Sequence, residues 1–369
     1  MREQRMPRLR EDGRVPDSPA TVPSDPSPET GSDAAPWAAD PGLRRALTEA
    51  VLAAARAARP LVGCGDGDAV DAAAVDALRR ALAGVPADIR VVSGEGEKDE
   101  APMLHPGERF GTGRGPSLDL VVDPVDGTRL AAGGYPGAMA ILAVAPRGAF
   151  ADLGPAFYLD KLVHAGPEAS GVDGAGAQAP GQALALDASV ADNLSRLAAA
   201  HDRPVSTLRV AVQRRPRNAT VADAVLAAGA QLHEFEHGDI ERVVHAVCAT
   251  GDLDLLLGIG GAPEGLLEAA IVRAHGGVMR ARLSPQSDAE RERLDGVLAA
   301  PGASGAGRLE GLSRPEGVGL DALCAAPALV VIAPVTPCAV GPAGAPLVIV
   351  DTAQRLDGWE PVSAGLTAG

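Results

Sequence analysis

A predicted buried strand, two aspartates, a glycine and a threonine follow one another in LDLVVDPVDGTR, residues 118–129. Asp123 and Asp126 lie three residues apart across what we expect to be a tight turn. Gly127 and Thr128 then begin a predicted helix, whose free N–H groups can bind an anion. Carboxylates for a hard cation beside an anion site are what a metal-dependent phosphatase requires. A solvated turn is the alternative, so the neighbouring segments decide.

A second acidic segment follows another predicted strand, in VVSGEGEKDEAPM at residues 91–103. Side chains that leave the carboxyl end of a strand lie where α/β sheets place their sites. Flanking glycines allow the backbone to bend, so that Glu95 can turn inward. The alternative is a solvated acidic loop. A third acid, Asp71, follows a glycine-rich loop near a predicted helix start, where its alternative role is that of a helix N-cap.

Two strands in the second half of the chain lead into a basic turn and a glycine-rich turn. The strand at 208–212 runs into QRRPRN, which contains Arg214, Arg215 and Arg217. Arginine suits bidentate recognition of a phosphate, and a surface charge cluster is the alternative. The run GIGGAPEG at 258–265 passes from strand to helix. It offers Glu264 as one more metal oxygen, although glutamate is also common at helix starts for dipole reasons.

These segments need a scaffold of strands and helices to bring them together. Helices are predicted at 41–59, 72–82, 219–228, 239–248 and 264–275, and further strands at 89–93, 138–144, 231–235, 253–257, 328–333 and 347–351. The alternation favours an α/β layer sandwich. A polar, glycine-rich composition predicts a loop between about 284 and 319. We expect a disordered N-terminal extension (1–40), a metal-binding phosphatase domain (41–207) and a substrate-binding α/β domain with a divergent C-terminus (208–369).

Composition restricts the partners of the chain. The 369 residues carry a formal net charge of −15, which argues against nucleic acid and anionic membranes as partners. The four cysteines are scattered without a CxxC pair, which disfavours structural zinc and a disulfide framework. We find neither a signal peptide nor an apolar run of membrane length. The expected location is the cytoplasm.

Taken together, these segments resemble one family, the class II fructose-1,6-bisphosphatases. The resemblance rests on GEGEKDEAPML, on GTGRG followed by VVDPVDGTRLA, on YLDKL, on the RPR turn, on HGD at 237–239 and on GIGGAPEG, and it covers about residues 46–282. DPVDGT is shared with the wider lithium-sensitive superfamily, which includes inositol monophosphatases. The resemblance implies a layered α/β/α/β/α sugar-phosphatase fold, in agreement with the predicted alternation.

The resemblance also implies roles for individual residues. It implies hydrolysis of the 1-phosphate of fructose 1,6-bisphosphate with two or more Mg²⁺ or Mn²⁺ ions, in a homo-oligomer (dimer or tetramer). The implied metal ligands are Asp71, Glu95, Asp123, Asp126 and Glu264. Thr128 would orient or deprotonate the attacking water, with support from Asp99. The implied substrate contacts are Asp126, Gly127, Thr128, Tyr158, Arg215, Pro216, Arg217, Gly238, Asp239 and Gly261.

Several positions depart from the family pattern and keep alternatives open. Gly67 and Asp68 stand where a lysine and an asparagine are usual, and His237 replaces an aspartate. The run at 330–346 lacks the usual glycine-aspartate pattern of the family C-terminus. A phosphatase for another sugar bisphosphate, such as sedoheptulose 1,7-bisphosphate, or for an inositol-type monophosphate is one alternative. A non-catalytic paralogue that binds a sugar phosphate is another.

Overall fold

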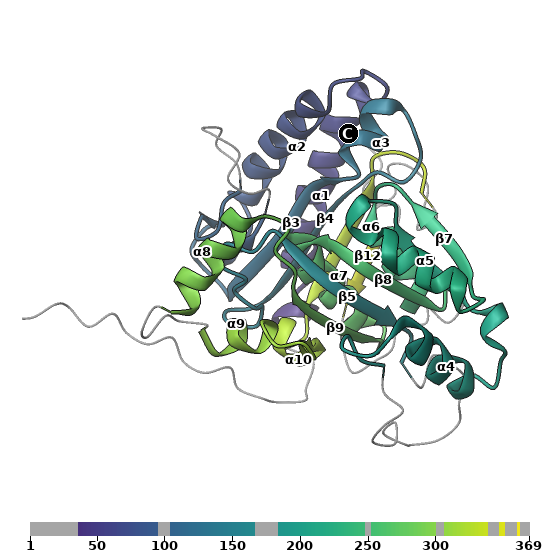
Figure 1. The fold of residues 1–369 in the computed structure, drawn as a ribbon. Helices are drawn as coiled ribbons and strands as arrows, with labels where there is room; N and C mark the ends of the chain where they lie inside the picture. The colour runs from purple at the N-terminus through teal and green to yellow at the C-terminus, as the bar shows by residue number, and fades with distance from the viewer. Residues whose placement is uncertain are drawn as a thin grey trace, which may run out of the picture.

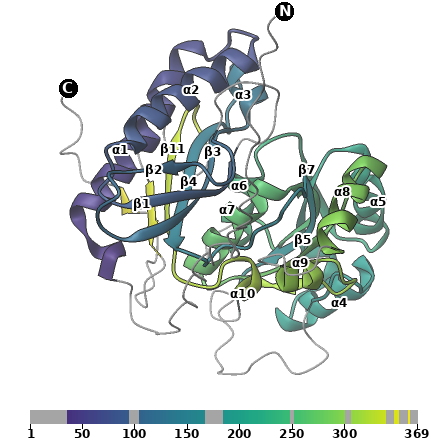
Figure 2. The same cartoon turned by 90° about the vertical axis from the view of Figure 1, so that its left-hand side faces the viewer.

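Two β-sheets and the helices around them form alternating layers in this computed structural model (Figures 1 and 2). The structure describes residues 36–94, 104–166, 184–247, 252–299, 306–338, 347–350 and 360–361. Figure 2 shows α1 and α2 outside the first sheet, α6 and α7 between the sheets, and α4 and α5 beyond the second sheet. The predicted α/β/α/β/α layering is therefore confirmed.

The outer layer of the first sheet consists of α1 (Pro41–Ala58) and α2 (Gly67–Leu82), which pack against each other. Asp40 caps α1 by accepting hydrogen bonds from the N–H groups of Gly42 and Leu43. Leucine, valine and alanine at helical spacing bury one face of α1 against the sheet. A short 3₁₀ helix, η1 (Pro36–Ala39), precedes α1, and η2 (Arg59–Leu61) follows it.

The first sheet has seven described strands in the order β13-β12-β11-β4-β3-β1-β2. Their bounds are β1 Asp88–Ser93, β2 Arg109–Phe110, β3 Ser117–Asp126, β4 Met139–Pro146, β11 Leu329–Pro334, β12 Leu347–Val350 and β13 Glu360–Pro361. In β3, Val121 packs into the core between the sheets, whereas Leu120 and Val122 pack under α1 and α2. Burial on both faces explains why this strand reads as a continuous apolar run.

The second sheet has six described strands in the order β10-β9-β5-β8-β6-β7. Their bounds are β5 Tyr158–His164, β6 Arg209–Gln213, β7 Gln231–Phe235, β8 Leu255–Gly261, β9 Val278–Leu283 and β10 Val318–Gly319. Between the sheets lie α6 (Asp239–Val247) and α7 (Ala262–Ala274), and outside lie α4 (Val190–Ala200) and α5 (Ala219–Ala227). The remaining short elements are α3 Thr128–Gly133, η3 Val205–Thr207, η4 Pro216–Asn218 and α10 Leu320–Leu323.

The predicted loop at 284–319 is wrong, because this segment forms α8 (Asp288–Leu298), α9 (Ala306–Leu312) and β10. The sequence did not predict α8 because only Glu290 and Leu294 of this helix are buried, so the helix has no apolar face to recognise. Buried Glu290 accepts a hydrogen bond from the Phe157 N–H at 2.8 Å, which connects the helix to the segment before β5, and a second one from the nearby Gln286 N–H at 2.9 Å.

Other expectations about the organisation of the chain are untested. The predicted boundary between 207 and 208 stays a prediction. Residues 1–35 of the predicted N-terminal extension lie outside the described residues. Among the helices that the structure describes, none is long and apolar enough to cross a membrane.

Buried His164, at the end of β5, should make the folded protein less stable in acid. Its side chain is 2% exposed, and its Nδ1–H donates to the Ala165 carbonyl at 2.7 Å. Burial lowers the pKa of His164 from 6.5 to about 4. The unfolded chain therefore takes up the proton first, so stability present above pH 6.5 is lost as the pH falls towards 4, by about 3 kcal/mol. Urea unfolding from pH 7 to 4 should show a smaller loss for His164→Asn, and equal losses would contradict this assignment.

Candidate active site

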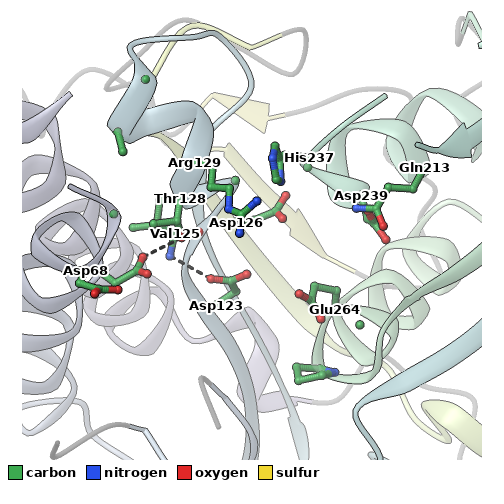
Figure 3. A pocket seen from close by; sticks show the side chains of 18 of the residues that line it. Asp68, Asp123, Val125, Asp126, Thr128, Arg129, Gln213, His237, Asp239 and Glu264 are labelled. Carbon is green, nitrogen blue, oxygen red and sulfur yellow. Dashed lines mark hydrogen bonds between the residues drawn. The ribbon is translucent and has the colours of Figure 1, made fainter. Parts of the chain in front are cut away.

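A cavity of 1320 Å³ lies between the carboxyl end of β3 and the turns that precede α5, α6 and α7 (Figure 3). The predicted site residues that line it are Asp71, Asp123, Asp126, Gly127, Thr128, Tyr158, Arg215, Arg217, Gly238, Asp239, Gly261 and Glu264. Pro216 begins η4 and is not among the lining residues. Glu95 and Asp99 lie outside the described residues, although Gly94, next to Glu95, lines the cavity. The structure thus brings together candidate residues from both halves of the chain.

The two aspartates of the opening motif lie within β3 rather than in a turn after it. The strand continues to Asp126, and its register against β4 shifts between Asp123 and Asp126. Such an irregularity re-aims side chains at the edge of a site. Asp123 accepts a hydrogen bond from the Val125 N–H at 2.9 Å, which fixes its carboxylate across the irregularity. The predicted tight turn is therefore wrong, because a bulge within the strand performs the change of direction.

Thr128 begins α3 and contacts an acid from a different helix. Gly127 before it has φ +80°, a left-handed conformation that favours glycine. The Thr128 hydroxyl lies 2.8 Å from Asp71 Oδ1 and 3.0 Å from the Val125 carbonyl. The N-cap of α2 is Asp66, which accepts from the Ala69 N–H, so the N-cap alternative for Asp71 is wrong. Asp71 lies within the helix and lines the cavity.

Asp126 is a buried carboxylate with one oxygen that no described residue hydrogen-bonds. Its side chain is 5% exposed, and Oδ2 has no hydrogen-bond partner in the described part of the chain. Burial raises the pKa of Asp126 well above its usual value, and the negative charges of Asp239, Glu264 and Glu268 raise it further. A buried oxygen in an excess of negative charge is the environment that a divalent cation would stabilise.

Glu264 lies in the first turn of α7, across the cavity from Asp123 (Figure 3). A Cβ at Gly261 would lie only 1.9 Å from Glu264 Oε2, so a glycine there lets the carboxylate fold back over the strand end. The oxygen-rich donor set fits a hard cation. Within the described ranges, however, no three Asp, Glu, His or Cys side chains lie close enough to hold a metal. Because Glu95 lies outside those ranges, the convergence of all five predicted ligands stays a prediction.

The turn before α5 contributes Arg215 and Arg217 to the cavity lining, and we call these two arginines its cationic side. The Arg217 guanidinium stacks over the Tyr158 ring at 4.6 Å and donates to Gln213 Oε1 at 2.9 Å. An Arg215 nitrogen lies 3.0 Å from His237 Nδ1. Burial lowers the pKa of Arg215, and the nearby charges of Arg217 and Arg129 lower it further. This mutual repulsion between cations is what a bound phosphate would relieve.

Sequence reasoning missed other residues that line the cavity. Arg129 follows Thr128 directly, and Gln213 directly precedes the basic turn, so position within each motif was an available signal. Phe157 also lines the cavity, beneath the Arg293 guanidinium at 5.0 Å. No local pattern predicted that contact, because Arg293 belongs to α8.

A family model described as bacterial fructose-1,6-bisphosphatase, glpX-encoded, matches residues 42–300. The chain belongs to this family. It is 40% identical over 235 residues to fructose-1,6-bisphosphatase 1 class 2 of Escherichia coli strain K12, and equally to fructose-1,6-bisphosphatase class 2 of Shigella flexneri. The match covers 64% of this chain and 66% of each relative, so the chain spans just under two thirds of their length. The family resemblance predicted from the sequence is thus confirmed, and the family is metal-dependent.

Proposed function

We propose that this member of the glpX-encoded fructose-1,6-bisphosphatase family hydrolyses the 1-phosphate of fructose 1,6-bisphosphate. The products would be fructose 6-phosphate and phosphate, as in gluconeogenesis. The observation that carries the proposal is a cavity lined both by the carboxylates Asp71, Asp123, Asp126 and Glu264, which we call its acidic side, and by Arg215 and Arg217. A bisphosphate has two dianionic ends, and the two sets of residues suit different ones. The carboxylates suit a phosphate through bound cations, and the arginines suit a phosphate directly.

The acidic side would bind the reacting phosphate. Asp71, Glu95, Asp123, Asp126 and Glu264 are the proposed ligands of two or more divalent cations, with Mg²⁺ or Mn²⁺ as the proposed ions. Such ions would neutralise phosphate charge and make a water molecule more acidic when bound. The Asp126 oxygen, which has no hydrogen-bond partner among the described residues, and the neighbouring carboxylates support this assignment.

The residues beside the acids would position the reactants. The Thr128 hydroxyl, fixed next to Asp71, would orient the attacking water towards phosphorus, with Asp99 in support. The substrate contacts that we propose are Asp126, Gly127, Thr128, Tyr158, Arg215, Pro216, Arg217, Gly238, Asp239 and Gly261. Arg215 and Arg217 would hold the distal phosphate, while Asp239 would accept a hydrogen bond from a sugar hydroxyl. Water would then attack in line, and the sugar oxygen would leave.

Arg217→Met is expected to weaken use of a bisphosphate much more than use of a monophosphate. The variant loses one charge-assisted contact to the distal phosphate, which should raise the KM for fructose 1,6-bisphosphate roughly 10- to 100-fold. Phosphate-release assays on this substrate and on fructose 1-phosphate would measure the difference. Arg214→Met is the matched control, because Arg214 is exposed, pairs with Glu236 and does not line the cavity. An equal loss on both substrates would contradict the distal-phosphate role.

The proposed function itself is tested by a substrate panel with Mg²⁺ or Mn²⁺. Fructose 1,6-bisphosphate should be hydrolysed with the highest kcat/KM among fructose 1,6-bisphosphate, sedoheptulose 1,7-bisphosphate and inositol 1-phosphate. Preference for the monophosphate would overturn the proposal. Binding of fructose 6-phosphate without turnover of any compound would favour the non-catalytic alternative.

We also propose that the protein acts in the cytoplasm as a homo-oligomer, a dimer or a tetramer. The strongly acidic net charge of −15, which disfavours anionic membranes and nucleic acid as partners, supports that location. Light scattering coupled to size-exclusion chromatography would measure the assembly. A monomer at micromolar concentration would contradict the oligomer.

A further inference from the structure

A lysine is buried beneath the cavity, in a position that the proposed chemistry does not use. Lys161 lies in the middle of β5 and is 1% exposed. Its ammonium donates to Asp239 Oδ2 at 2.9 Å and to Glu268 Oε1 at 2.5 Å. Asp239 begins α6 and lines the cavity, whereas Lys161 and Glu268 do not. The ammonium therefore joins a proposed substrate contact to a carboxylate behind it.

The surrounding backbone leaves room for this buried charge. A Cβ at Gly260 in β8 would lie 2.4 Å from Asp239 Oδ2 and 2.6 Å from Lys161 Nζ. Only a residue without a side chain can therefore stand opposite the pair. Burial works against the ammonium, but Glu268 and Asp239 outweigh it and raise the pKa of Lys161. Lys161 is consequently a permanent cation in the interior.

Asp239 connects Lys161 to Arg217 at the cavity through further hydrogen bonds. Its other oxygen, Oδ1, accepts a hydrogen bond from Gln213 Nε2 at 3.1 Å. Gln213 Oε1 in turn accepts from Arg217 at 2.9 Å. Figure 3 shows Gln213 and Asp239 side by side at the cavity. One continuous series of hydrogen bonds thus runs from Glu268 through Lys161 and Asp239 to the Arg217 guanidinium.

Two other buried carboxylates lie near Asp239 and repel its charge. Asp126 and Glu268 are both buried near Asp239, and burial together with the neighbouring carboxylates raises the pKa of each. Like charges repel strongly where water is excluded. Lys161 offsets this repulsion at Asp239 Oδ2 and leaves Oδ1 directed towards Gln213.

We propose that Lys161 is a positioning residue that holds the Asp239 carboxylate for a sugar hydroxyl and, through Gln213, holds Arg217 for the distal phosphate. This inference rests on the proposed function. It assigns specificity for the sugar bisphosphate to a residue that never touches the substrate. A purely structural role, in which Lys161 only neutralises a buried charge, predicts a less stable protein with unchanged kinetics per folded molecule.

A double-mutant cycle in the full-length chain distinguishes these roles. We expect Lys161→Met to raise the KM for fructose 1,6-bisphosphate roughly 10- to 100-fold with a smaller change in kcat. Asp239→Ala should do the same. The double variant should be no worse than Asp239→Ala within about twofold, because both changes remove one interaction. If the KM increases of the two single variants multiplied in the double variant, the proposal would be overturned. Calorimetric titration with fructose 6-phosphate should give the same pattern in Kd.

Two further variants test whether a loss of stability, rather than a loss of positioning, raises the KM. Lys161→Met/Glu268→Leu leaves a buried apolar pair, so it should be more stable than Lys161→Met while keeping the raised KM. Recovery of the wild-type KM would overturn the proposal. Arg90→Met is the matched control, since Arg90 pairs with buried Asp119 in the first sheet, outside the cavity lining. It should lower the unfolding temperature and leave KM within about twofold.

The wild-type enzyme in the same assay separates this inference from the proposed function. If wild-type protein failed to hydrolyse fructose 1,6-bisphosphate, the proposed function would fail by itself. If wild-type protein hydrolysed it and Lys161→Met kept the wild-type KM, the positioning role alone would fail.

Discussion

Asp126→Asn is expected to abolish phosphate release and, without divalent metal, to make the protein more stable. The buried Oδ2 of Asp126 has no partner among the described residues, and three neighbouring carboxylates repel its charge. The amide keeps Oδ1 as an acceptor and removes the charge. In EDTA at pH 8 the free energy of unfolding should rise by about 1–2 kcal/mol. Because the pKa of Asp126 is raised in the folded state, the gain shrinks as the pH falls.

Divalent metal should reverse this order of stability. Wild-type protein in Mn²⁺ should unfold at a higher temperature, since an ion that binds only the folded state stabilises it. Asp126→Asn should respond weakly, and its kcat should fall by roughly three orders of magnitude or more. Asp68→Asn makes the same chemical change at an exposed residue of the cavity, and it should keep the response to Mn²⁺. An Asp126→Asn protein with normal turnover would show that Asp126 is not a ligand.

The layered fold was predictable because its signals are local. A strand buried on both faces, such as β3, must be apolar along its length, and the helices between strands show apolar residues at helical spacing. Some residues of the candidate site were also predictable, because they lie where an apolar strand ends or in the first turn of a helix. Thr128 and Glu264 are examples: Thr128 begins α3, Glu264 lies in the first turn of α7, and both line the cavity.

Other features depend on contacts between distant segments and were missed for that reason. YLDKL reads as a family motif, yet the partners of Lys161 lie 78 and 107 residues further along the chain. The helix α8 is polar because it is mostly exposed, and only one leucine and one glutamate of it are buried. The bulge in β3 depends on pairing with β4, whose register a sequence does not reveal. Tertiary pairing, rather than propensity, decides each of these.

Thr128→Val is expected to lower kcat by roughly 10²- to 10⁴-fold with little change in KM. Valine keeps the shape and the methyl group of threonine but has no hydroxyl. In the wild-type structure that hydroxyl lies 2.8 Å from Asp71 Oδ1 and 3.0 Å from the Val125 carbonyl. Both neighbours are acceptors, so the single hydroxyl proton is donated to one of them. A lone pair then remains available to accept a hydrogen bond from the attacking water.

Thr128→Ser is the matched control, because it restores the hydroxyl on a side chain with more rotational freedom. It should retain kcat within about tenfold, the loss reflecting a less fixed position. Steady-state phosphate release would give kcat and KM, and the thermal unfolding temperature would test folding of both variants. If valine and serine lowered kcat equally, any disturbance of the packing at the start of α3 would explain the loss, and the hydroxyl would have no special role. If valine kept full activity, water activation would have to come from another group at the acidic side, and the role proposed for Thr128 would be wrong.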